Sequence, residues 1–383
     1  MIAGKDDLTK HSGYCGTTGR SNDGPCWNAS YRATELGYSA WQARTPGKLG
    51  TLTPNAGPYN AYLAESTVVL PNGSLANAQW VHDVCFGETG LNPDQKLPHS
   101  NWTCCHGAQV CDVPEHLPAE YYEDNWVGQK GLEMLLQRPP GQPWYMQVNW
   151  PGPHTPFIVT KEMMESTATR PFNPPVDYFF GPNSEADNIV ARRLYAAEVE
   201  NLDSWFAKYI HATQQLGDYD RTIICISSDH GEMLGDHGDW DKEKPWEGSS
   251  HVPLVCSGPG IRMQTISQPV TTMDLAATWL DLAGLTGMGS MVQSTSRSLV
   301  PVLSGDVPQN REFVSSGLGQ NASGFPANQT WDWRMVVKRA VFSSAPDAEP
   351  QSLKYFLRRL FLLAADPFYS GILHCFECRS TLS

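Results

Sequence analysis

From Trp126 onward, the spacing of apolar residues alternates between a helical and a strand-like pattern. Apolar residues form a helical face over residues 126–136 and recur at steps of three and four over residues 195–209, which predicts two amphipathic helices. The first predicted face holds Val127, Leu132, Leu135 and Leu136, and the second holds Tyr195, Val199, Leu202, Phe206 and Tyr209. Residues 273–283 predict a further helix that ends at Gly284.

Short apolar runs between these helices predict buried strands. They end near Trp150, Ser227 and Cys256, and each continues into a polar or Gly/Pro-rich loop. The alternation predicts an α/β fold, with a mostly parallel sheet sandwiched by helices over residues 1–309. A small antiparallel α+β subdomain with an atypical tail is expected over residues 310–383.

The first third of the chain differs from the rest in composition. It is rich in Gly, Pro, Asn and Cys with little periodicity, which predicts long surface connections. Six of the ten cysteines lie there and could form disulfides or remain thiols: Cys15, Cys26, Cys85, Cys104, Cys105 and Cys111. Five Asn-x-Ser/Thr sequons favour a secretory route over a cytosolic one, beginning at Asn28, Asn72, Asn101, Asn321 and Asn328.

Charge and hydropathy narrow the possible partners. With 27 basic and 40 acidic residues, the net charge of -13 argues against nucleic acid, whose phosphates require a basic surface. A small anionic substrate stays possible, because a local group of a metal and lysines can hold an anion on an acidic protein. No apolar run reaches the roughly 18–20 residues of a membrane span, and residues 1–10 show no signal-peptide core.

The densest group of polar residues follows the predicted strand that ends at Ser227. Asp229 and His230 are adjacent there, and such a pair can bind a divalent cation. Lys242 can return to the same rim of the sheet as a point charge for an anion. His154 also follows a predicted strand, so it is expected at this rim too. Taken alone, these residues equally fit solvated loops.

A longer motif around these residues favours the first interpretation. Residues 228–238, with Lys242 and Val252-Pro253-Leu254, resemble the second signature region of the sulfatases, in the alkaline phosphatase superfamily. Further similar stretches are Gly4-Lys5-Asp6-Asp7-Leu8, Pro153-His154-Thr155-Pro156-Phe157, Glu200-Asn201-Leu202-Asp203, Asp274-Leu275-Ala276-Ala277-Thr278 and Ala364-Ala365-Asp366-Pro367-Phe368. The resemblance therefore covers most of the chain.

The resemblance implies a role for each matching residue. Asp229 and His230 would be ligands of a metal, usually Ca2+, with Mg2+ or Mn2+ as alternatives. Lys242 would stabilise charge on the sulfate as the ester breaks, and His154 would hydrogen-bond the sulfate or the leaving oxygen as a candidate acid. Lys5 would hold the sulfate group. His237 would bind substrate or brace its loop, and Glu232 and Asp236 are expected to stiffen that loop.

The sequence departs from the family at the nucleophile. Sulfatases carry a first strand that ends in Asp-Asp and a Cys (or Ser) in a Cys-x-Pro/Ala-x-Arg context that is oxidised to formylglycine, and none of the ten cysteines here stands in that context. Cys15 precedes Gly-Thr-Thr-Gly-Arg20, and Cys26 precedes Trp-Asn-Ala. Because the Gly-Lys motif begins at Gly4, these features are expected upstream of Met1, so the chain is interpreted as a truncated and inactive fragment.

Three functions follow from these observations. The first is a sulfuric ester hydrolase that acts on a sulfated small molecule or carbohydrate in the secretory pathway, the lysosome or the cell exterior. The second is a phosphodiester or phosphonate monoester hydrolase of the same superfamily. The third is a non-catalytic, truncated pseudoenzyme. Lys5, His154, Asp229, His230 and Lys242 are expected to converge in one pocket, and the sequence does not define the oligomeric state.

Overall fold

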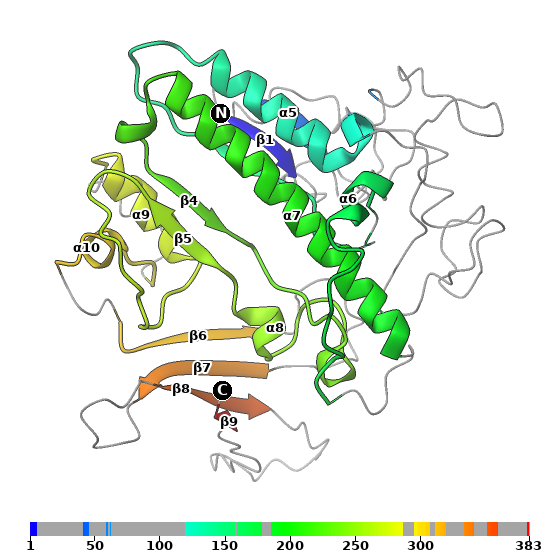
Figure 1. Cartoon of the computed structure of the whole chain (residues 1–383). Coiled ribbons are helices and arrows are strands. Elements are labelled where there is room, and N and C mark those ends of the chain that lie inside the picture. Colours follow the sequence, from blue (N-terminus) through cyan, green and yellow to red (C-terminus); the bar gives the residue numbers. More distant parts are fainter. Residues whose placement is uncertain are drawn as a thin grey trace, which may run out of the picture. The chain divides into compact units, whose positions relative to one another are not determined.

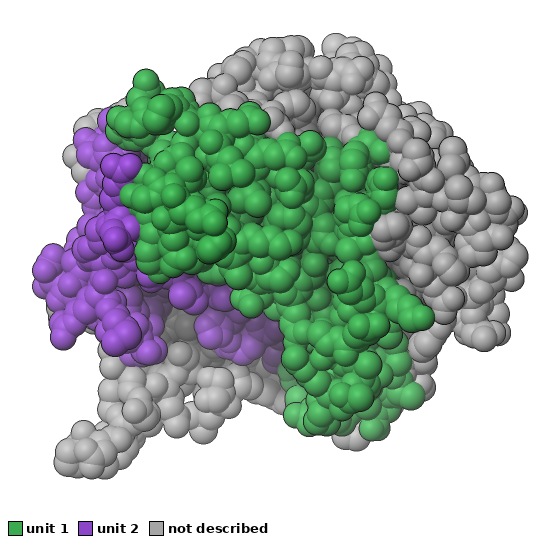
Figure 2. Space-filling model, turned by 45° about the horizontal axis from the view of Figure 1, so that its top comes forward, with its two compact units in different colours: residues 1–219, 233–241 green, residues 220–232, 242–383 purple. Residues whose placement is uncertain are grey.

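A computed structural model describes the fold in two compact units (Figures 1 and 2). It describes residues 1–5, 41–45, 59, 62, 119–155, 157, 159–177, 185–285, 295–306, 311–318, 333–340, 351–358 and 381–382. Unit 1 comprises residues 1–219 and 233–241, and unit 2 comprises residues 220–232 and 242–383. The loop 233–241 therefore belongs to unit 1, although the residues on either side of it belong to unit 2.

The helices and strands alternate along the chain as the apolar pattern predicts. Unit 1 holds β1 (Ile2–Lys5), β2 (Trp41–Thr45), η3 (Ala119–Tyr121), α5 (Glu123–Leu136), β3 (Gln147–Asn149), α6 (Lys161–Glu165), α7 (Glu185–Gln215) and η5 (Asp236–Gly238). After η4 (Tyr219–Arg221), unit 2 holds β4 (Ile224–Ser227), α8 (Glu247–Ser250), β5 (Leu254–Ser257), α9 (Asp274–Leu282), α10 (Val300–Leu303), β6 (Phe313–Leu318), β7 (Trp333–Ala340), β8 (Gln351–Arg358) and β9 (Thr381–Leu382). None of the described helices is both long and apolar enough to cross a lipid bilayer.

The sheet of unit 1 is parallel. Its strands lie in the order β2-β1-β3, and Gly4 of β1 pairs with Asn149 of β3. Helix α5 packs against these strands and α7 lies beside α5 (Figure 1). The expected α/β arrangement of parallel strands and covering helices is therefore confirmed here.

Two glycines bring α5 and α7 into close contact. A Cβ atom on Gly128 would lie 2.3 Å from the Trp205 ring, and one on Gly131 would lie 2.1 Å from the Tyr209 hydroxyl. Tyr209 also donates a hydrogen bond to the Gly128 carbonyl at 2.8 Å. A larger residue at either glycine would force the helices apart, so the two aromatic side chains fix their separation.

The predicted helix faces are partly wrong. Val127 and Leu135 are buried, but Leu136 is 52% exposed and Val199 is 43% exposed. The buried side of α7 instead includes Ala191, Leu194, Ala197 and Trp205. Small alanines allow close approach there, and apolar spacing alone does not show which of two overlapping faces a helix buries.

Strands β4 and β5 of unit 2 form an antiparallel pair, whereas the sequence predicted parallel strands. Ile224 pairs with Ser257, and Ser227 pairs with Leu254. The chain thus leaves β4 and enters β5 at the same end of the pair, which requires opposite directions. A parallel pairing would need a crossover to the other end, and a run of apolar residues does not encode that choice.

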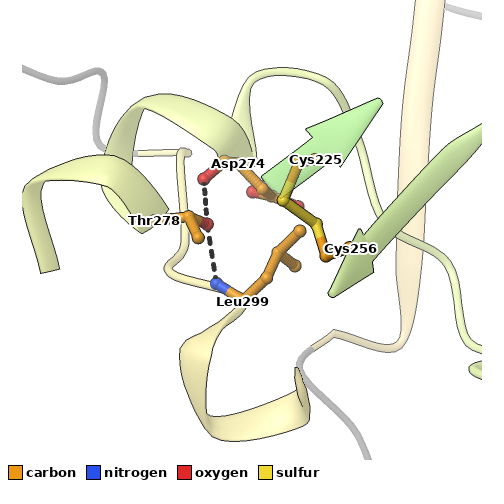
Figure 3. Close-up of a disulfide and its surroundings, with 5 residues drawn as sticks. All are labelled: Cys225, Cys256, Asp274, Thr278 and Leu299. Atoms are coloured by element: carbon orange, nitrogen blue, oxygen red, sulfur yellow. Dashed lines mark hydrogen bonds between the residues drawn. A yellow bond between two sulfur atoms is a disulfide. The ribbon is translucent and has the colours of Figure 1, made fainter. Parts of the chain in front are cut away.

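A disulfide joins this strand pair. Cys225 and Cys256 are register partners, and their sulfur atoms are bonded. The Leu299 side chain points toward the disulfide, which lies beside the start of α9 (Figure 3). The sequence left open whether the six cysteines of the first third form disulfides, and these cysteines lie outside the described residues. The Cys225–Cys256 disulfide was not predicted.

Loss of this disulfide is expected to destabilise the protein. The bond closes a loop with a sequence separation of 31 residues, for which chain entropy in the unfolded state gives about 3–4 kcal/mol. Cys225→Ala/Cys256→Ala should lower the urea unfolding midpoint accordingly under oxidising conditions. In a reducing buffer the parent and the double variant should have the same urea unfolding midpoint. A difference in midpoint that persisted there would show that the loss of stability comes from packing.

The last strands form an antiparallel sheet in the order β6-β7-β8-β9. Trp333 pairs with Leu318 of β6 and with Arg358 of β8, so β7 lies between these two strands. Such a sheet agrees in type with the small subdomain expected from about residue 310. The domain boundary at residues 309/310 stays a prediction.

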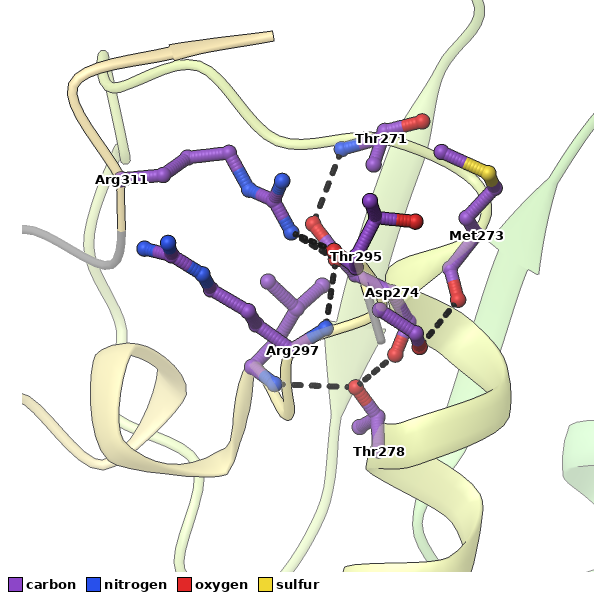
Figure 4. A network of polar contacts seen from close by, with 9 residues as sticks. Thr271, Met273, Asp274, Thr278, Thr295, Arg297 and Arg311 are labelled. Atoms are coloured by element: carbon purple, nitrogen blue, oxygen red, sulfur yellow. Dashed lines mark hydrogen bonds and ion pairs between the residues drawn. The ribbon is translucent and has the colours of Figure 1, made fainter. Parts of the chain in front are cut away.

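A buried carboxylate ties the start of α9 to the segment that precedes β6. Asp274 is fully buried and accepts hydrogen bonds from the Thr271 amide at 3.1 Å and the Arg297 amide at 2.9 Å. The Arg311 guanidinium forms an ion pair with the same carboxylate (Figure 4). Thr278, also buried, accepts from the Leu299 amide at 2.9 Å, so two side chains of α9 hold Arg297, Leu299 and Arg311.

Candidate active site

The candidate metal pair follows β4 directly. The His230 Nδ1 atom lies 2.9 Å from the Gly231 carbonyl oxygen. Because a carbonyl only accepts, Nδ1 is the donor, and in the neutral ring Nε2 then carries the lone pair that a metal requires. Nε2 lies 3.7 Å from Asp229 Oδ2, and the Asp229 side chain is 63% exposed. A carboxylate oxygen suits a hard divalent cation, so Asp229 Oδ2 and His230 Nε2 are the candidate donor atoms of a metal site.

Two ligands do not complete a metal site. Calcium takes six to eight oxygen ligands and magnesium takes six. Within the described part of the chain, no group of three or more His, Cys, Asp or Glu side chains is placed to hold a metal ion. Asp229 and His230 can therefore supply part of a coordination shell, and the remaining ligands must come from water, substrate or other residues.

The turn after the metal pair packs against α8. The Gly231 amide donates to the Ser249 carbonyl at 2.9 Å, and a Cβ atom on Gly231 would lie 2.0 Å from the Gly248 carbonyl oxygen. Only glycine fits at this approach. The short helix α8 thus fixes the direction in which the chain leaves His230, which explains a glycine directly after the pair.

His154 lies in the loop that follows β3. Its Nδ1 atom is 2.7 Å from the Thr155 carbonyl oxygen, so Nδ1 is the donor and Nε2 carries the lone pair. The neutral ring therefore accepts a hydrogen bond at Nε2, and the protonated ring donates one there. This is the atom through which His154 could act as an acid toward a leaving oxygen.

A buried carboxylate of α5 holds this loop. Asp124 is 1% exposed, and its Oδ1 atom accepts from the Gly152 amide at 2.8 Å. A Cβ atom on Gly152 would lie 2.3 Å from Asp124 Oδ2, so only glycine allows this approach. Nearby, burial first and then the charges of Glu198 and Asp124 raise the pKa of Tyr122 well above its ordinary value, so its phenol stays neutral.

Lys5 and His154 come from adjacent parallel strands. Lys5 is the last residue of β1, and Gly4 before it pairs with Asn149, the last residue of β3. The carboxyl ends of parallel strands meet at one edge of the sheet, so the backbone at Lys5 and the loop of His154 lie at the same edge. The Lys5 side chain lies outside the described residues.

His237 lies in the unit 1 loop 233–241, which we call the His237 loop. Buried Met233 and Trp240 anchor its two ends. The His237 amide donates to the Val176 carbonyl at 2.7 Å, and His237 Nδ1 lies 3.4 Å from Asp177 Oδ2. Asp236 is paired with Arg192 of α7, which makes it a bracing residue of the loop, whereas the role of His237 stays a prediction.

The six predicted site residues divide between the two units. Lys5, His154 and His237 belong to unit 1, and Asp229, His230 and Lys242 belong to unit 2. Lys242 directly follows Asp241, whose backbone is left-handed at φ 65°. The predicted convergence of these residues in one pocket stays a prediction.

Sequence reasoning missed two residues that support the site loops. Asp124 holds the loop of His154 across 28 residues, and Arg192 holds the His237 loop across 44 residues. A carboxylate in the first turn of a helix usually indicates capping. Gly152 beside Pro151 and Pro153 was the one available signal, because a glycine there can mark a close approach.

Comparison with solved structures defines the class of the fold. The chain is similar to a phosphonate monoester hydrolase of Agrobacterium radiobacter, with a TM-score of 0.53 and 19% sequence identity. The similarity covers 81% of this chain and 63% of that one. The expected alkaline-phosphatase-like α/β fold is thereby confirmed.

The family follows from comparison of sequences. The model of the Sulfatase family matches residues 29–285, which is more than half of the chain. The chain belongs to the sulfatase family, as the motif around Asp229 indicates.

Curated relatives carry sulfatase names. The chain is 26% identical to the choline-sulfatase of Rhizobium meliloti (strain 1021) over 255 residues, which cover 58% of this chain and 49% of the relative. It is 36% identical to human arylsulfatase K over 215 residues, covering 50% of this chain and 36% of the relative. For human iduronate 2-sulfatase the identity is 29%, covering 45% of this chain and 36% of the relative. The chain thus spans less than half the length of these relatives.

Proposed function

We propose that the protein to which this chain belongs is a sulfuric ester hydrolase that uses a divalent metal. The observation that carries the proposal is the pair Asp229 and His230, placed directly after β4 with Nε2 of His230 and Oδ2 of Asp229 3.7 Å apart. Family membership favours sulfate as the ester group. A sulfated carbohydrate or small molecule is the proposed substrate, as the names of the relatives suggest.

The metal we propose is Ca2+, with Mg2+ or Mn2+ as alternatives. A carboxylate oxygen suits a hard cation, and an imidazole nitrogen broadens the choice toward Mn2+. When bound, the cation would neutralise charge on the sulfate group. Asp229 and His230 would hold it through Oδ2 and Nε2.

Three further residues would act on the substrate. Lys242 would donate to a sulfate oxygen and stabilise charge as the ester bond breaks. His154, held at Nδ1 by the Thr155 carbonyl, would act through Nε2 on the leaving oxygen. Lys5 would bind the sulfate as a point charge, and His237 is proposed as a substrate contact.

The family's nucleophile does not fit the residues of this chain. None of the ten cysteines stands in the Cys-x-Pro/Ala-x-Arg context that is converted to formylglycine. No attacking step is therefore assigned to a cysteine of this chain. A non-catalytic role for the chain by itself is the alternative that this observation favours.

A phosphonate monoester hydrolase is the second candidate function. The observation that favours it is the likeness to the Agrobacterium radiobacter enzyme over 81% of this chain. Proteins with a fold of this class hydrolyse several kinds of ester, and the residues of the site determine which ester is hydrolysed. A secretory, lysosomal or extracellular location is proposed for either enzyme, because the five sequons favour glycosylation.

The test compares esters in a protein that carries the family's nucleophile motif ahead of this chain. With calcium, its kcat/KM should be highest for an aryl sulfate, and lower for an aryl phosphate and a phosphonate monoester. Lys242→Ala should lower kcat by roughly 10²–10³-fold, because it removes a charge that stabilises the transition state. Lys244→Ala is the matched control and should change little. A preference for the phosphonate would replace the first proposal with the second.

A further inference from the structure

We propose that Arg192 of α7 is a positioning residue for the His237 loop and thereby sets the place of His237. The proposal rests on the proposed function only in calling His237 a substrate contact. Arg192 lies on a long helix of the same unit as the loop, 44 residues before Asp236. Its action on the loop is independent of the reaction.

The Arg192 guanidinium contacts the loop at two acceptors. Its Nε atom donates to the Leu234 carbonyl at 3.1 Å, and its NH2 group forms an ion pair with Asp236. The side chains of Arg192 and Asp236 are 18% and 31% exposed, so water screens this pair less than a surface ion pair. The planar fork of arginine holds its two donor nitrogens in a fixed geometry toward both acceptors, whereas the ammonium of lysine has no such fixed fork.

Asp236 transmits this anchoring to His237 through a neighbouring segment. The Asp236 Oδ1 atom also accepts from the Val176 amide at 2.8 Å. The Val176 carbonyl in turn accepts from the His237 amide at 2.7 Å. One residue, Val176, therefore joins the carboxylate that Arg192 holds to the backbone of His237, and Asp177 follows with its carboxylate 3.4 Å from His237 Nδ1.

The loop needs such an anchor because its backbone is unusual. Leu234 and His237 have left-handed φ angles of 50° and 58°, a region that costs a non-glycine residue about 1–2 kcal/mol. Gly235, at φ 85°, lies so close to Pro175 that a Cβ atom would be 2.9 Å from its ring. Contacts from outside the loop have to hold this conformation, and those of Arg192 reach the carbonyl of Leu234 and the side chain of Asp236.

The test measures amide hydrogen exchange of this chain in three variants. Arg192→Met removes both contacts and should speed exchange at the amides of residues 235–239 by roughly tenfold or more, as expected when a charged hydrogen bond is lost. Arg192→Lys keeps the charge and should give an intermediate increase. Arg193→Met is the matched control: Arg193 lies on the same helix but stacks over the Phe172 ring at 5.8 Å, so the loop should exchange as in the parent.

A second signal separates positioning from general stability. In Arg192→Met the imidazole NMR signals of His237, assigned with His237→Gln, should shift, while exchange in the rest of α7 stays within about twofold of the parent. Unchanged loop exchange in Arg192→Met, or the same increase in Arg193→Met, would overturn the proposal.

Inorganic sulfate distinguishes this proposal from the proposed function. If His237 contacts substrate, sulfate should slow exchange at its amide in the parent and less so in Arg192→Met. No sulfate effect on the parent would count against the proposed function, whereas exchange measured without sulfate decides the role of Arg192.

Discussion

The chain from Met1 to Ser383 is expected to hydrolyse an aryl sulfate at only trace rates. A protein with the family's nucleophile motif ahead of residue 1 should be faster by roughly 10⁴-fold or more, because loss of a nucleophile costs a factor of this order. The residues proposed for the site would bind and polarise an ester, but none of the ten cysteines stands in the context that yields the family's nucleophile. The measurement is kcat for an aryl sulfate with added calcium, after expression of both lengths in a host that makes formylglycine.

The affinity for calcium should also differ between the 383-residue chain and the extended protein. Asp229 and His230 would supply two ligands, and calcium requires six to eight. The short chain should therefore bind calcium weakly by titration calorimetry, and the extended protein more tightly. Asp229→Asn in the extended protein is the control, and it should weaken binding and turnover together. Equal turnover by both lengths would show that our account of the nucleophile is wrong.

Asp274→Ala is expected to destabilise the protein by about 3–5 kcal/mol. The change leaves the Arg311 guanidinium, whose side chain is 11% exposed, without its ion-pair partner. It also removes the acceptor for the Thr271 and Arg297 amides. Urea unfolding followed by circular dichroism measures the loss.

Two variants identify the cause of that loss. Asp274→Asn keeps an acceptor oxygen and should lose less stability than the alanine variant. Adding Arg311→Met to Asp274→Ala should recover part of the loss, because no unpaired charge remains. Asp281→Ala, on the same helix and bonded to the Ser298 hydroxyl, is the matched control and should cost about 1 kcal/mol. Equal losses for Asp274→Ala and Asp281→Ala would contradict a special role for the buried carboxylate.

The sequence predicted helices α5, α7 and α9 and strands β3, β4 and β5, but not every partner of these elements. The runs that end at Ser227 and Cys256 predicted β4 and β5, because burial on a strand leaves a local pattern. Their antiparallel pairing and their disulfide depend on where the chain returns, which no local pattern contains. Val199 shows the same limit within a helix, because the residues opposite it decide which side is buried.

A sequence motif identified the candidate site residues but not the residues that support them. Asp229, His230 and His154 follow strands, as expected, since a strand end can be recognised from sequence. Asp124 and Arg192 are ordinary charged helix residues until the fold brings Gly152 and Asp236 against them. The supporting contacts of a site join residues that are far apart in the sequence. The sequence of a single chain gives no sign of such contacts.

The length of α7 has a consequence for insertions and deletions. Arg192 must reach the His237 loop, and Trp205 and Tyr209 must meet the two glycines of α5. One residue added between Arg192 and Trp205 would rotate one group against the other by about 100° and shift it by about 1.5 Å. Both contacts could not then survive, so α7 acts as a spacer of fixed length. Side chains on its outer surface can vary freely, whereas the number of residues between these contacts cannot.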